Sequence, residues 1–86
     1  MLDDLKDPKD IRKYLDRLEL SIESVQHRLR RFEAEFGMDS EAFYAKLQNA
    51  QLDERVEYAE WAGEHERLLH LKEQKRELEA RLSPKE

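Results

Sequence analysis

Residues 11–36 decide the fold of this chain, and they read IRKYLDRLELSIESVQHRLRRFEAEF. Apolar side chains recur along this stretch at alternating intervals of four and three residues: Ile11, Leu15, Leu18, Ile22, Val25, Leu29, Phe32 and Phe36. This alternation is a heptad repeat, which places a narrow apolar stripe along one side of a helix. The stretch therefore predicts a long amphipathic helix that packs against a second helix.

Capping residues define the limits of this first helix, which we expect to span about residues 8–36. Asp7 can accept hydrogen bonds from the free N–H groups of a first turn, and Pro8 suits the first helical position. Gly37 follows the last apolar residue of the repeat and can adopt the left-handed conformation that ends many helices.

Two further helices are predicted after Gly37. A short one is expected at about 40–49, with Asp39 or Ser40 as its N-cap. A long one is expected at about 54–82, with Asp53 as a candidate N-cap. Ser83 and Pro84 are expected to end it.

The third helix has a heptad repeat of its own. Its two core positions are occupied by Trp61, Glu64, Leu68, Leu71, Lys75, Leu78 and Leu82. Because the connection between the long helices is short, they must be antiparallel neighbours. Phe32 then faces Trp61 beside the bend, and Ile11 faces Leu82 at the open end. We predict an all-α fold: one domain over residues 1–86, built as an antiparallel, coiled-coil-like helical hairpin with a short helix at the bend.

The composition of the chain argues against several classes of function. Charged residues are 43% of the 86-residue chain and apolar residues only 38%, a balance typical of long exposed helices. The formal net charge of −5 argues against direct nucleic-acid binding, which normally needs a basic face. Cysteine is absent, and no apolar run is long enough to span a membrane. We expect a cytoplasmic protein.

Catalytic and metal-binding motifs are not apparent in the sequence. Glu66 and His70 are four residues apart, as are Glu23 and His27, and such pairs can place two ligands on one ion. Helical di-metal proteins use a Glu-x-x-His spacing, which does not occur here. We expect no metal, no cofactor and no enzymatic activity.

The third helix carries more apolar surface than one partner helix can cover. Beside its heptad positions runs a second row, formed by Tyr58, Ala62, His65 and Leu69. An isolated two-helix hairpin that exposed this face would be only marginally stable. We expect the face to be shared with another chain, either a second copy or a different protein. The alternative is that the short helix folds back and covers it with Phe43, Tyr44 and Leu47.

These features define a predicted partner-binding set. The segment from Asp53 to Glu66 contains six acidic residues and one arginine, so a basic partner is favoured. The third helix contributes Glu57, Tyr58, Glu60, Trp61, Ala62, His65 and Leu69, and the short helix contributes Phe43 and Tyr44.

The residues around the bend also resemble a known class of proteins. The string FEAEFGMDSEAFY at residues 32–44, followed by Glu60-Trp61-Ala62, is similar to motifs of small prokaryotic helical proteins from toxin–antitoxin gene pairs, in which they are the antitoxin-like partner. The resemblance covers about half of the chain. It implies a non-enzymatic protein that binds and neutralises a partner protein. The chain has no helix-turn-helix or ribbon-helix-helix pattern of the kind that antitoxins often use to bind DNA.

The sequence therefore favours two functions. The first is an antitoxin-like interaction module that docks on a basic partner through the third helix and the bend. The second is a structural or chaperone-like coiled-coil hairpin that acts as a homo-oligomer, with a homodimer expected when the chain is alone.

Overall fold

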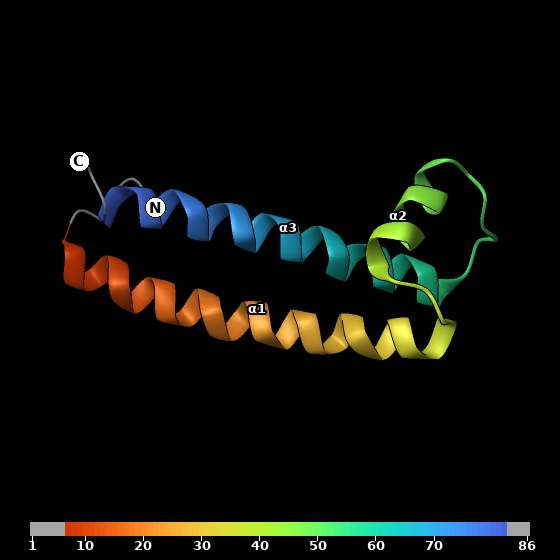
Figure 1. Cartoon of the computed structure of the whole chain (residues 1–86), viewed down its shortest axis with the longest axis horizontal. Coiled ribbons are helices and arrows are strands. Elements are labelled where there is room, and N and C mark those ends of the chain that lie inside the picture. Colours follow the sequence, from red (N-terminus) through yellow and green to blue (C-terminus); the bar gives the residue numbers. More distant parts are fainter. Residues whose placement is uncertain (1–6, 83–86) are drawn as a thin grey trace.

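The computed structural model describes residues 7–82 and confirms the all-α hairpin. Two long helices, α1 (Pro8–Phe36) and α3 (Val56–Leu82), lie antiparallel, and the short helix α2 (Ser40–Gln48) sits at the bend (Figure 1). The molecule is elongated, with principal extents of 47 × 22 × 22 Å. The predicted stop of the third helix at Ser83 and Pro84 lies outside the described residues.

The caps of α1 follow the predictions from the sequence. The Asp7 side chain accepts a hydrogen bond from the Lys9 N–H at 2.9 Å, and Pro8 takes the first helical position. Gly37 ends the helix in the left-handed conformation, with φ +66°, and its N–H donates to the Glu33 carbonyl at 2.8 Å. The left-handed geometry is the one that a Cβ disfavours, which is why glycine suits this position.

The start of α2 uses one of the two predicted caps. The Asp39 side chain accepts from the Ala42 N–H at 2.8 Å, so Asp39 is the N-cap and Ser40 is the first helical residue. The start of α3 differs from the prediction. It begins at Val56, three residues after Asp53, so Asp53 does not take the N-cap position. The chain first turns through Ala50, at φ 55°, and packs Leu52 against the core, and only then becomes helical.

Two apolar clusters hold the long helices together in the predicted register. The larger lies at the bend and contains Ile22, Val25, Leu29, Phe43, Trp61 and Leu68. The smaller lies at the open end and contains Ile11, Leu18 and Leu78, with Leu82 packed against it. Phe32 stacks on Trp61, with ring centres 5.6 Å apart, as the antiparallel register requires.

Glu64 and Lys75, the two polar residues at the heptad core positions of α3, form ion pairs with charged residues of α1. Arg28 Nε lies 3.0 Å from Glu64 Oε2, at an angle that makes the contact an ion pair and not a hydrogen bond. Lys75 Nζ lies 2.5 Å from Glu19 Oε2, and this carboxylate raises the pKa of Lys75. Since these pairs are partly exposed, solvent screens them and each contributes little to the stability of the hairpin. Their main effect is to make other registers less favourable.

The two glycines allow a matched stability test, because a Cβ built on either would meet no atom within 4 Å. Gly63 lies inside α3 with ordinary helical geometry, so Gly63→Ala should raise the free energy of unfolding by about 0.5–1 kcal/mol. Gly37 is left-handed, so Gly37→Ala should lower it by about 1–2 kcal/mol. Urea denaturation followed by circular dichroism measures both. Equal effects of the two substitutions would contradict the assigned cap geometry.

Candidate interaction surfaces at the bend

Trp61 occupies the centre of the bend and is fully buried. Phe43 of α2 lies nearly parallel to its indole, at 2° and with ring centres 3.8 Å apart. Phe36 of α1 stacks at 5.5 Å, next to the Phe32 ring already described. All three phenylalanines of the chain therefore contact this one indole. Contacts between aromatic rings contribute about 0.5–1.5 kcal/mol each beyond the burial of their area.

A hydrogen-bond chain joins the same indole to the other two helices. The Trp61 Nε1–H donates to Ser40 Oγ at 2.8 Å. The Ser40 hydroxyl and backbone N–H both donate to Glu33 Oε2, each at 2.8 Å. Ser40 thus provides the acceptor for the buried indole N–H of Trp61. The Glu33 carboxylate of α1 in turn accepts hydrogen bonds from the first residue of α2.

This packing places three of the predicted binding residues in the interior. Trp61 and Phe43 are completely buried, and His65 is 7% exposed. They are inaccessible to a partner as long as the hairpin stays closed. The short helix folds back over the bend, which is the alternative weighed from the sequence, and it covers the upper part of the broad apolar face.

Three further predicted residues are half-buried beneath or within α2. Tyr58 packs against Phe43, with ring centres 5.4 Å apart, and Ala62 belongs to the same cluster. The Tyr44 hydroxyl donates to Glu66 Oε2 at 2.6 Å, and this bond raises the pKa of Tyr44. The Tyr44 ring also lies 4.8 Å from the ring of His65. Through these contacts Tyr44, Tyr58 and Ala62 hold α2 against α3, and each of the three side chains stays only partly accessible to solvent.

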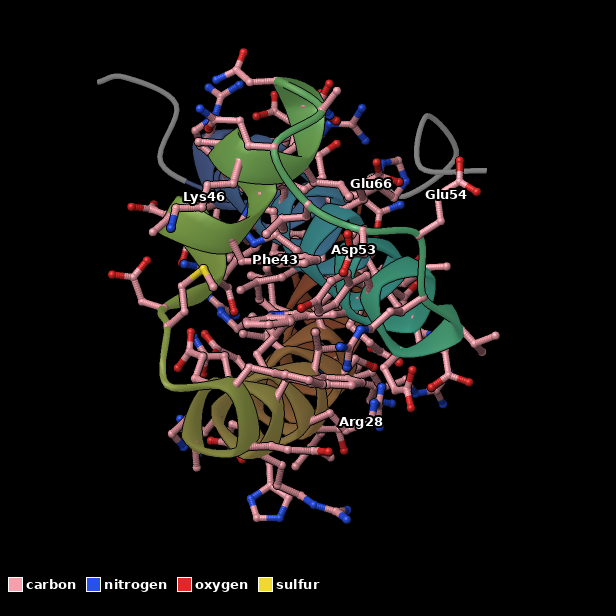
Figure 2. The ribbon with its side chains drawn as sticks, turned by 90° about the vertical axis from the view of Figure 1, so that its right-hand side faces the viewer. Arg28, Phe43, Lys46, Asp53, Glu54 and Glu66 are labelled. Carbon is pink, nitrogen blue, oxygen red and sulfur yellow. The ribbon has the colours of Figure 1, made fainter. Side chains whose placement is uncertain are left out.

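The remaining predicted residues are exposed. Glu57 and Glu60 lie beside two more exposed acids, and we call Asp53, Glu54, Glu57 and Glu60 the acidic row. Within residues 7–82, no member of the acidic row forms an ion pair. The nearby Arg55 lies over the Tyr58 ring, 5.6 Å from its centre. Figure 2, which looks at the bend end-on, shows Glu54 projecting outward at the edge of the molecule and Phe43 at its centre.

A second surface is a groove of about 370 Å³ between the long helices, beside the start of α2. We call it the α1–α3 groove. It is lined by Gln26, Leu29, Arg30, Glu33, Asp39, Ser40, Glu41, His65, Leu68, Leu69 and Lys72. The predicted Leu69 is 52% exposed at this groove, and the Nδ1 atom of His65 is buried without a hydrogen-bond partner.

The residues predicted from the sequence include His65 and Leu69 on the α3 side of this groove, but none of its lining residues from α1 or from the start of α2. The contributions of α1 and of the first residues of α2 depend on where α2 packs, and no local pattern in the sequence specifies that position. Among residues 7–82, no group of three or more His, Asp or Glu side chains could hold a metal ion. In the same part of the chain, no helix is long and apolar enough to cross a membrane.

Comparison with known proteins adds no relative: no family model matches the sequence, and no curated protein or solved structure does so either.

Removing the Ser40 hydroxyl tests the hydrogen-bond chain. Ser40→Ala leaves the Trp61 N–H buried without an acceptor, so it should lower the free energy of unfolding by about 1–3 kcal/mol. In a Trp61→Phe background there is no indole N–H, and the same serine substitution should cost clearly less. Urea denaturation of the four proteins in this double-mutant cycle gives the coupling. A coupling of zero would show that the bond does not stabilise the hairpin.

Proposed function

We propose that this chain is a non-enzymatic protein–protein interaction module, antitoxin-like, that binds a basic partner protein and neutralises it. The acidic row is the observation that carries the proposal. Its four carboxylates are exposed at one end of the molecule, and none is paired within residues 7–82. We place this activity in the cytoplasm, as expected from the sequence.

Some acids of the hairpin are paired internally, whereas the acidic row gathers four unpaired acids within residues 53–60. Glu19, Glu64 and Glu73 each form an ion pair with a basic side chain. Like charges held near one another repel, although Glu57, in the first turn of α3, is favoured by the positive end of that helix dipole. A basic surface that docked there would relieve this repulsion.

Electrostatics would mainly give this encounter its speed and its selectivity. Complementary charge steers two proteins together and disfavours wrong partners, whereas apolar anchors give the complex its lifetime. Val56 is such an anchor candidate, because it is 73% exposed at the start of α3, between Glu54 and Glu57. A partner that buried Val56 would bring its basic residues next to the acidic row.

The proposal predicts capture of a basic protein from an extract of the source organism by the tagged chain. The triple variant Glu54→Gln, Glu57→Gln, Glu60→Gln should bind this protein about tenfold more weakly or worse, since each lost charge pair is worth up to about 1 kcal/mol. Affinity is measured with the purified partner by calorimetry, at low and at raised salt concentration.

The matched control is Asp16→Asn, Glu23→Gln, Glu77→Gln, which removes the same charge from exposed positions outside the acidic row. This control should bind like the unchanged chain. If both triple variants lose affinity equally, net charge alone governs binding and the acidic row is not the docking surface. If no stoichiometric basic partner is captured, the antitoxin-like proposal is wrong.

A further inference from the structure

We propose that the α1–α3 groove is the interface between two copies of this chain, packed antiparallel across a twofold axis. This inference does not depend on the proposed function, because none of the acidic-row residues lines the groove. A dimer formed here leaves the acidic row of both copies accessible to other proteins.

The floor and rim of the groove supply the apolar contact. Leu29 and Leu68 are 4% and 8% exposed and form the floor, while Leu69 stands beside them at 52%. A leucine that projects from a helix next to an apolar depression is what a self-complementary interface needs. Each copy then inserts its Leu69 over the Leu29 and Leu68 floor of the other copy. Burial of such a side chain is favourable because it removes apolar surface from water.

Charge is distributed unequally along the groove. Lys72 lies on α3 two helical turns beyond His65, in the direction away from the bend, and Glu41 lies in the first turn of α2. The helix α2 sits at the bend (Figure 1). Within residues 7–82, neither side chain forms an ion pair. Lys72 and Glu41 are therefore opposite charges without a partner, on either side of the apolar floor of a groove whose lining is otherwise mostly polar.

A twofold axis through the middle of the groove forms two ion pairs between the copies at once, one on each side of the apolar floor. Such an axis reverses the direction of the second copy, so Lys72 of each chain meets Glu41 of the other. The carboxylates of Glu33 and Asp39 are already bonded at the start of α2, and Arg30 is a further exposed charge of the lining that such an axis leaves without an opposite partner. A partner with parallel orientation would instead bring like charges together.

The apolar part is tested with two leucines of similar exposure. Leu69→Asp should convert the dimer to monomer, because it places a charge on the apolar floor of the other copy. Leu20→Asp is the control: Leu20 is 67% exposed on α1 and does not line the groove, so this variant should remain dimeric. Sedimentation velocity over a range of concentrations measures the association, and circular dichroism verifies that each variant is folded.

The twofold arrangement is tested by reversing one charge at a time. Lys72→Glu and Glu41→Lys should each weaken self-association by about tenfold or more, since both cross-pairs become repulsive. An equimolar mixture of the two variants should form a heterodimer, because both pairs are again of opposite sign. Native mass spectrometry detects the heterodimer directly.

Three results would overturn the inference. An unchanged chain that stays monomeric at all concentrations would show that the groove is not an interface between two copies. A dimer that survives Leu69→Asp would lie on another face. Charge-reversed variants that fail to form a heterodimer when mixed would exclude the antiparallel twofold packing.

Discussion

Burial of the Trp61 indole with its N–H satisfied is the constraint on which the rest of the hairpin depends. The indole can be covered only if α1 supplies Phe32 and Phe36 and α2 supplies Phe43 at the same time. Its N–H needs an acceptor in the same place, and Ser40 provides it. An unsatisfied polar group there would cost about 1–3 kcal/mol. Packing and polarity thus demand one common position for α2, which closes the bend and fixes the register of the long helices.

The position of α2 then determines which surfaces remain for other molecules. By covering Trp61, Tyr58 and part of His65, α2 removes most of the apolar row of α3 from solvent. What stays exposed is Leu69 at the α1–α3 groove and the acidic row at the start of α3. The two surfaces share no residue, so the proposed self-association and the proposed partner binding do not compete for the same side chains.

Most of the architecture could be predicted from the sequence because it is specified locally. Heptad spacing defines the long helices, and Asp7, Gly37 and Asp39 are capping residues whose preferences act within a single turn. The third helix, predicted from about residue 54, begins two residues later, at Val56, so Asp53 is not its N-cap. The heptad repeat already placed Trp61 at a core position facing Phe32, but the interior positions of Phe43 and His65 could not be derived in the same way. Whether the apolar row of α3 is exposed depends on where α2 packs, and that position is set by tertiary contacts and not by the local sequence.

Native-state hydrogen exchange tests most directly the claim that the bend holds the hairpin together. The account predicts the slowest exchange for amides of α1 and α3 that flank the larger cluster, around Val25 and Leu68. Amides around Ile11 and Leu78, at the smaller cluster of the open end, should exchange faster through local separation of the helix ends. Uniform protection along both long helices, or the strongest protection at the open end, would contradict the central place given to Trp61.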